Sequence, residues 1–139
     1  MTSPSLVLHV PLMDQDHARI EALLAQVPGA ADQDLPRLLR EIEVETVGHF
    51  DREEALMRLE GVPVLHCHIA QHRIILSALA EGHRAIEMGD MPALRRFLSV
   101  ELAGAITAHI GSADRVTASF LKGEISTEDL DRLRLPDPT

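Results

Sequence analysis

Apolar residues recur at three- and four-residue intervals along most of the chain, which predicts amphipathic helices throughout. Alternating strand patterns and hairpin dipeptides such as Asn-Gly are absent. Glycine and proline gather at a few points, which cut the chain into four helical pieces. These points are Pro28 with Gly29, Gly61 with Pro63, Gly89 with Pro92, and Gly123.

The breaks set the bounds of the expected helices. Short loops between long amphipathic helices imply antiparallel neighbours, so we predict an all-α fold, an up-down-up-down four-helix bundle. Residues 1–12 are expected to form an irregular arm and 122–139 a polar tail, helical or frayed. The helices should run from an N-cap at Asp14 to Val27, from about Leu35 to Glu60, from about Val64 to Met88, and from about Pro92 to Leu121.

Length and charge narrow the class of protein. A chain of 139 residues fits one domain, 1–139, with its core at about 12–121. With 13 basic and 22 acidic residues, and no basic stripe interleaved with aromatics, nucleic acid and anionic membrane are poor partners. The single cysteine, the lack of a signal-like N-terminus and the lack of long apolar runs predict a cytoplasmic protein that does not span a membrane.

Three pairs of potential metal ligands fall on the predicted helices. His49 and Glu53 are four residues apart, as are His68 and His72, so each pair projects from one helix face. His109 and Asp114 are five apart, about 140° around an α-helix, within reach of a shared centre if the carboxylate bends toward it. All three pairs lie on apolar stripes, where an unpaired imidazole or carboxylate is costly.

The pairs also fall at one level of the bundle. Counting from the turns at a rise of about 1.5 Å per residue places the first two pairs level to within roughly 3 Å. The third pair matches His68 and His72 more closely still. His17, on the first helix, is offset by about 6 Å, which the following loop could absorb, so its membership is the weakest on geometry.

Five imidazoles and two carboxylates are too many ligands for one ion and suit two ions bridged by the carboxylates. Imidazole favours iron, copper or zinc, whereas magnesium and calcium prefer oxygen shells. The set also differs from the four glutamates and two histidines of ferritin-like bundles. Fewer anionic ligands should stabilise high-valent iron less, which favours binding of dioxygen over oxidation chemistry.

These residues resemble the hemerythrin family. The resemblance rests on "MDQDH" ending in His17, "HFDREEALM" with His49 and Glu53, Pro63 followed by His68 and His72, and "HIGSAD" with His109 and Asp114. It covers roughly residues 10–120. Known four-helix bundles include members of this family, so the predicted fold and the resemblance agree.

The resemblance implies an oxo- or hydroxo-bridged centre of two iron ions that binds dioxygen reversibly as a peroxide. His68, His72 and His109 would hold one iron, His17 and His49 the other, and Glu53 and Asp114 would bridge them. Ile20, Phe50 and Ile110 would line an apolar oxygen pocket. Ala105 stands where the family often has tryptophan, so we expect a wider pocket and faster autoxidation, which Ala105→Trp should slow.

The remaining polar residues have simpler interpretations. His83 should be structural and outside the site, and Cys67 a helix-packing residue. His66 and His9 should be solvated, and we attach no role to Asp16. Glu54, Asp51 and Arg52 are interpreted as an exposed helix face, and Glu45 and Glu101 as exposed charges that could serve as outer acceptors for ligand N–H groups.

Three functions stay open at this point. One is an oxygen carrier, store or sensor, whose ligand could also be nitric oxide or peroxide. Another is a di-iron enzyme with peroxidase- or oxidase-like activity. The third is a metal-handling bundle that holds zinc or labile iron.

Overall fold

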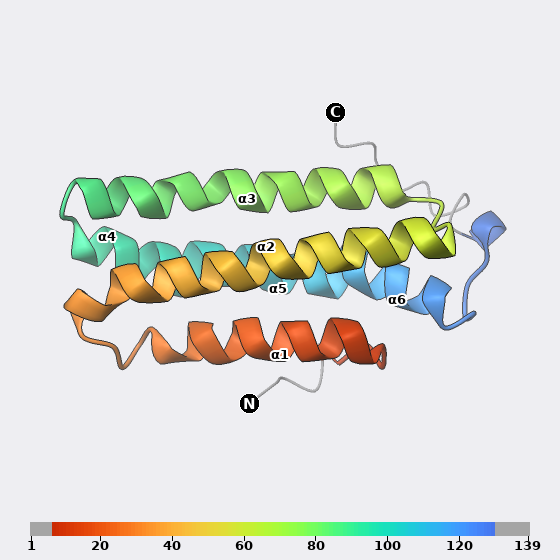
Figure 1. Ribbon diagram of the computed structural model, residues 1–139, viewed down its shortest axis with the longest axis horizontal. Coiled ribbons are helices and arrows are strands. Elements are labelled where there is room, and N and C mark those ends of the chain that lie inside the picture. Colours follow the sequence, from red (N-terminus) through yellow and green to blue (C-terminus); the bar gives the residue numbers. More distant parts are fainter. Residues whose placement is uncertain (1–6, 130–139) are drawn as a thin grey trace.

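The computed structural model describes residues 7–129, which form an antiparallel four-helix bundle without strands (Figure 1). The first three helices lie side by side in Figure 1, with the fourth helical stretch behind them. That stretch is continuous, and its α-helical hydrogen bonding is interrupted twice by a π-helical segment. The elements are α1 (Pro11–Gln26), α2 (Leu35–Glu60), α3 (Leu65–Glu87), α4 (Met91–Arg96), η3 (Phe97–Leu102), α5 (Ala103–His109), η4 (Ile110–Asp114) and α6 (Arg115–Leu121), with a short 3₁₀ turn, η2 (Asp32–Asp34), before α2.

The start of α1 differs from the sequence prediction, which made Asp14 the N-cap. The N-cap is Val10, and Pro11 takes the first helical position, where its missing N–H costs nothing. Asp14 lies inside the first turn, and its carboxylate accepts hydrogen bonds from the backbone N–H groups of Leu8 and His9 at 2.9 Å each. The irregular arm is therefore shorter than predicted, and residues 1–6 lie outside the described range.

The other helix bounds were predicted to within one residue, because glycine ends both central helices. Gly61 ends α2 at φ 66°, and the next N–H, that of Val62, bonds back to Met57 at 3.0 Å. Gly89 follows α3 at φ 65°. Asp90 then caps α4, because its carboxylate accepts the N–H of Ala93 at 3.1 Å.

The fourth helical stretch contains two π-helical segments, η3 and η4, that hydrophobic periodicity did not predict. A π-helical turn accommodates about one residue more than an α-helical turn and is frequent at functional sites. Phe97, the first residue of η3, packs closely against Gly82 on α3. A Cβ at Gly82 would lie 3.0 Å from the Phe97 ring and 2.9 Å from the Leu39 side chain. This contact closes the end of the core that lies away from the ligand pairs.

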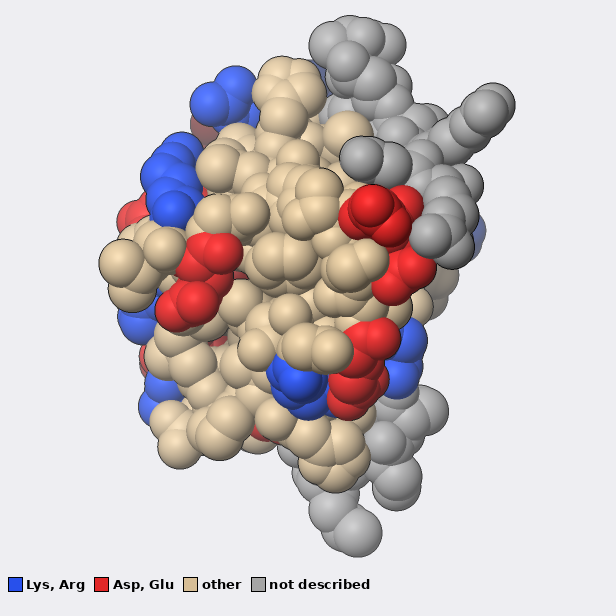
Figure 2. Space-filling view, turned by 90° about the vertical axis from the view of Figure 1, so that its right-hand side faces the viewer, with Lys and Arg blue, Asp and Glu red and all other residues tan. Residues whose placement is uncertain are grey.

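After α6 the described residues contain only turns and one short helical turn. Ser126 and Asp129 exchange hydrogen bonds at the start of a helical turn at 127–129, and the rest of the predicted polar tail lies outside the described residues. Within 7–129 no helix is long and apolar enough to cross a membrane. Figure 2 shows the end of the bundle that contains the α2–α3 turn, with acidic and basic side chains scattered and no large patch of one sign.

Candidate metal centre

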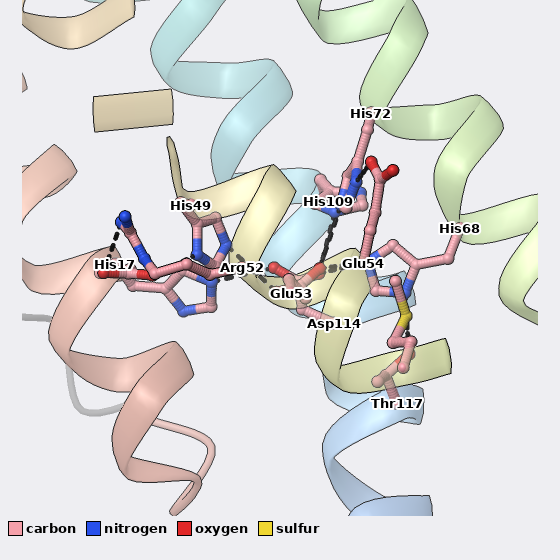
Figure 3. A network of polar contacts seen from close by, with 12 residues as sticks. His17, His49, Arg52, Glu53, Glu54, His68, His72, His109, Asp114 and Thr117 are labelled. Carbon is pink, nitrogen blue, oxygen red and sulfur yellow. Dashed lines mark hydrogen bonds and ion pairs between the residues drawn. The ribbon is translucent and has the colours of Figure 1, made fainter. Parts of the chain in front are cut away.

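The structure brings all seven candidate ligands together inside the bundle (Figure 3). Each is at most 5% exposed. Every long helical stretch contributes at least one, so the cluster lies on the axis that the four stretches share. The ligands are His17 from α1, His49 and Glu53 from α2, His68 and His72 from α3, His109 from α5 and Asp114 from η4.

The ligand atoms form two overlapping groups, within each of which they lie at most 4.8 Å apart. That spacing suits atoms about 2.0–2.2 Å from a common ion. Glu53 and Asp114 belong to both groups. The first group adds His68, His72 and His109, and the second adds His17 and His49. His17, the weakest candidate from sequence, has its Nε2 3.0 Å from an Asp114 oxygen.

Several of these close contacts are not aligned as hydrogen bonds. His49 Nε2 lies 3.1 Å from Glu53, and His109 Nε2 lies 2.9 Å from Asp114. Yet neither nitrogen has a hydrogen-bond partner. The same is true of His17 Nε2 and of one carboxylate oxygen each of Glu53 and Asp114. Buried polar atoms are rarely left so. Atoms that converge without pairing are expected where they share an ion, so the donor set fits a metal centre.

A π-helical turn explains how His109 and Asp114 reach the same centre. The sequence prediction required the Asp114 side chain to bend back across about 140° of an α-helix. The π-helical segment η4, Ile110–Asp114, widens the turn between them instead, so residues five apart lie on nearly the same face. The backbone, rather than side-chain bending, therefore aligns this pair.

Asp16 orients one of the histidines, a role that the sequence analysis did not assign. It is 1% exposed, and its carboxylate accepts the Nδ1–H of His49 at 3.0 Å. Arg52 donates two hydrogen bonds to Asp16, at 2.9 and 3.0 Å, and Arg19 donates one at 2.7 Å. Arg52 is exposed, as predicted, and it also holds this carboxylate in place.

Three more histidines have outer partners at Nδ1. His72 donates to Glu54 at 2.9 Å, which corrects the prediction that Glu54 is only an exposed residue. His109 donates to the side-chain oxygen of Gln71 at 2.9 Å. His68 donates to Thr117 at 2.8 Å, and the Thr117 hydroxyl in turn donates to the sulfur of Met57. A proton fixed on Nδ1 leaves Nε2 free as the metal-binding nitrogen.

Charges inside the cluster stabilise one another. Burial and the nearby Asp114 oppose ionisation of Glu53, but contacts with three histidines outweigh them and lower its pKa to about 2. Burial likewise opposes ionisation of Asp114, whose histidine contacts still lower its pKa. Burial disfavours the charged form of His68, but Asp114 and Glu53 raise its pKa to about 9. For His109, burial prevails and lowers the pKa. Both carboxylates are therefore anionic at neutral pH.

A small cavity adjoins the His17 and His49 side of the cluster. It offers about 10 Å³ to the centre of a water-sized molecule, which is room for one such molecule. Ile20, Phe50 and Ile110 line it, together with residues that the sequence analysis did not name. These are Thr46, Ile75 and Ile106.

Ala105 does not line this cavity. It lines a neighbouring hollow with Gln71, Ile74, Ile75 and His109, and the last two of these also line the small cavity. The expectation that alanine at this position widens the ligand pocket stays a prediction, which Ala105→Trp tests. Phe50, by contrast, lines the small cavity, and its ring stacks on His72 at 3.8 Å between centroids.

The remaining candidates lie away from the cluster. His83 pairs with Glu43 at 3.0 Å on the bundle surface, and His66 is exposed. Cys67 is partly buried and lines a third cavity, between α3 and α6. Of the two possible outer acceptors, Glu45 lies 3.7 Å from Arg19 and Glu101 lies 3.9 Å from Arg96, both away from any ligand histidine.

Sequence reasoning missed the outer partners Asp16, Glu54, Gln71 and Thr117. Three of them directly adjoin a ligand in the chain, beside His17, Glu53 and His72. Adjacency to a ligand was thus the available indication, but an adjacent residue in a helix points about 100° away, so which neighbours turn inward required the structure.

Comparison with known proteins agrees with this geometry. A family model described as the hemerythrin HHE cation-binding domain matches residues 8–121. A curated protein named bacteriohemerythrin, from Ralstonia nicotianae, is 34% identical over 119 residues, a match that covers 86% of each chain. No solved structure gives a significant match. Since the family model spans most of the chain and the candidate ligands, the chain belongs to the hemerythrin family.

Proposed function

We propose that this protein holds two iron ions and binds dioxygen reversibly, as a carrier, store or sensor. The observation that supports two ions is the sharing of Glu53 and Asp114 between two overlapping ligand groups. If the site held a single ion, neither carboxylate would have to lie within reach of both groups of histidines. The similarity to a bacteriohemerythrin and the family name support a metal, and the mixed imidazole and carboxylate donors favour iron.

The two ligand groups would treat their ions differently. The first group offers three imidazoles, from His68, His72 and His109, and the second offers two, from His17 and His49. The ion of the second group would therefore keep a position for an external ligand, next to the small cavity. Iron held there would supply the electrons that dioxygen needs in order to bind. The chain supplies the position, the geometry and the surroundings.

The cavity walls favour a very small ligand over an organic substrate. Apart from Thr46 and the candidate metal ligands, its lining is isoleucine and phenylalanine. Such walls slow the delivery of protons, and the space has room for about one water-sized molecule. Nitric oxide and peroxide meet the same size limit, so the test below compares ligands directly.

Iron stoichiometry and a reversible oxygen titration test the proposal. We expect two iron ions per chain, and we expect the anaerobic ferrous protein to develop a visible absorption band in air that fades on purging. The same titration with nitric oxide and with peroxide compares the three ligands. His68→Ala and His109→Ala should lower the iron content, whereas His83→Ala, at a histidine outside the cluster, should not.

Two results would contradict the proposal. One iron per chain would exclude the bridged arrangement. Direct conversion to the oxidised form with consumption of a substrate would indicate an enzyme instead.

A further inference from the structure

His17 differs from the other candidate ligand histidines, because its Nδ1 has no hydrogen-bond partner among the described residues. A partner at Nδ1 fixes the tautomer and the orientation of a metal-binding imidazole. Each of the other four histidines has one, at 2.8–3.0 Å from Nδ1, in the pairs His49 with Asp16, His68 with Thr117, His72 with Glu54 and His109 with Gln71. The support of His17 is therefore incomplete by comparison.

Glu21 has a buried carboxylate that lacks a donor. The residue as a whole is partly exposed, but both of its carboxylate oxygens are buried and neither has a hydrogen-bond partner within the described part of the chain. Glu53 and Asp114 each have one such oxygen, and both are candidate metal ligands. A buried carboxylate without partners is destabilising, because it has lost its hydrogen bonds to water without replacing them. Its presence in this helix therefore calls for a physical reason.

The unpaired nitrogen and the unpaired carboxylate lie about one helical turn apart on α1. Glu21 follows His17 by four residues, a step that makes two side chains neighbours on one helix face, with about 5–6 Å between their Cβ atoms. Side chains of a helix lean toward its N-terminus, so that of Glu21 leans toward His17. No hydrogen bond joins the two groups in this structure. The rotatable bonds of a glutamate side chain give its carboxylate the reach to form one at this spacing.

We propose that Glu21 is the positioning residue of His17, and that its carboxylate accepts the Nδ1–H of His17 when Nε2 binds an ion. This inference rests on the proposed function, which assigns His17 and His49 to the second ion. Both imidazoles of the second group then have a charged partner, from Asp16 and Glu21, whereas only Glu54 is charged among the partners of the first group. A carboxylate partner makes an imidazole a more basic ligand, which favours the ion that has fewer imidazoles.

Thr46 on α2 is the competing partner for His17. Its hydroxyl is also buried and has no hydrogen-bond partner among the described residues, and the residue borders the same small cavity as His17. A carboxylate accepts a hydrogen bond more strongly than a neutral hydroxyl does, which favours Glu21. Thr46→Val therefore enters the tests below as the alternative.

Stability of the metal-free protein gives the first test. Glu21→Met removes a carboxylate that has no partner and keeps an unbranched side chain of similar length, so the midpoint of thermal unfolding should rise. Glu54→Met removes a carboxylate that is bonded to His72 and should lower the midpoint, which makes it the matched comparison. A fall in the midpoint for both Glu21→Met and the isosteric Glu21→Gln would mean that the carboxylate is already bonded within the fold, and that result would overturn the proposal.

Affinity for the second ion gives the second test, measured by competition with a chelator. Glu21→Met should weaken this affinity about tenfold, as is typical for loss of an outer partner of a metal ligand. Glu21→Gln keeps an acceptor oxygen and should restore part of the affinity. Glu81→Met, at an exposed carboxylate on α3, should leave the affinity unchanged.

Proton NMR of the zinc-loaded protein gives the third test, because it observes the proposed bond itself. A hydrogen-bonded imidazole N–H exchanges slowly with water and is detected far downfield. The Nδ1–H resonance of His17 should be present in wild type and in Glu21→Gln, and it should be lost in Glu21→Met. If Thr46→Val loses this resonance and Glu21→Met keeps it, the partner of His17 is Thr46 and the proposal is wrong.

The outcomes separate this inference from the function on which it rests. If wild type holds two ions and Glu21→Met binds both with the affinity of wild type, the role of Glu21 is wrong and the proposed function stands. If Glu21→Met weakens the second ion but keeps the His17 resonance, the effect does not pass through the proposed bond, and the role of Glu21 is also wrong. If wild type fails to hold two iron ions, the proposed function itself fails.

Discussion

His109 Nε2 lies 2.9 Å from Asp114 Oδ1, and the five-residue step between them is accommodated by the π-helical segment Ile110–Asp114. Four residues would suffice in an α-helix, as between His49 and Glu53 or His68 and His72. The π-helical turn accommodates one extra residue, and this keeps Asp114, which both ligand groups share, on the same helix face as His109.

Deletion of Gly111 tests this dependence. It would leave His109 and Asp114 four residues apart, the spacing at which an α-helical turn holds two ligands on one face. We therefore expect the deletion variant to keep its iron content, because an α-helical turn then replaces the π-helical one. Gly111→Ala is the control, because a Cβ at Gly111 meets nothing within 4 Å and the five-residue spacing is kept. A fall in iron content in the deletion variant alone would contradict this account of the turn.

Substitution of Asp16 tests the outer support of His49. Asp16→Asn keeps an acceptor but loses the charge that Arg52 and Arg19 hold in place, and Asp16→Ala loses both. We expect about a tenfold loss of affinity for the second ion in the first variant and up to about a hundredfold in the second. Competition with a chelator measures the affinity. Asp51→Asn, at an exposed position on α2, should leave it unchanged.

Ion binding should depend on pH with a defined sign. In the metal-free protein the pKa of His68 is raised to about 9, so its ring carries a proton at neutral pH. Metal ligation requires the neutral ring, so loading releases this proton, and affinity should rise with pH up to about 9, by at most tenfold per pH unit for this group. Glu53, with a pKa of about 2, stays ionised and adds nothing over this range. Zinc titration in a weakly buffered dye solution measures the protons released, and no release near pH 7 would contradict the prediction.

Two glycines on helices should respond in opposite ways to alanine. At Gly82 a Cβ would lie 2.9 Å from Leu39 and 3.0 Å from Phe97, so Gly82→Ala should lower the free energy of unfolding by about 1–3 kcal/mol. At Gly104 the space is open, and Gly104→Ala should raise it by about 0.5–1 kcal/mol, because glycine weakens helices. Urea unfolding of the metal-free protein measures both. A similar change in the free energy of unfolding in both variants would show that the close contacts of Gly82 with Leu39 and Phe97 do not restrict this position.

Most of the fold followed from local rules in the sequence. The bounds of α2 and the turns at Gly61 and Gly89 are fixed by residues whose conformational preferences are strong and independent of distant contacts. The start of α1 was misplaced because both Pro11 and Asp14 are good residues for a helix N-terminus. Asp14 instead accepts hydrogen bonds from Leu8 and His9, which precede the helix. This role depends on the path of those two residues, which the sequence pattern does not specify.

The candidate ligands were accessible from sequence because they combine buried positions with metal-binding side chains. The outer partners were not, since Glu54 and Arg52 occupy positions that periodicity assigns to solvent, and long side chains reach back from such positions into the core. The π-helical segments were also missed, because a uniform period of 3.6 residues cannot represent one wider turn. The full lining of the cavity was not predicted, because it depends on which side chains meet across helices.

The contact of His17 with Asp114 has a consequence for how the chain is held together. The α1 helix packs mainly on α2, its neighbour in sequence, and this buried pair is one of its links to the fourth helical stretch, beside the hydrogen bond from Arg95 to Val27. An ion shared by the two residues would close a loop that includes most of the bundle, and closing a loop of that length restricts the unfolded chain strongly. Loading would then act as a clasp between the first and last helices, and iron would protect the protein from unfolding and from proteolysis that begins at α1.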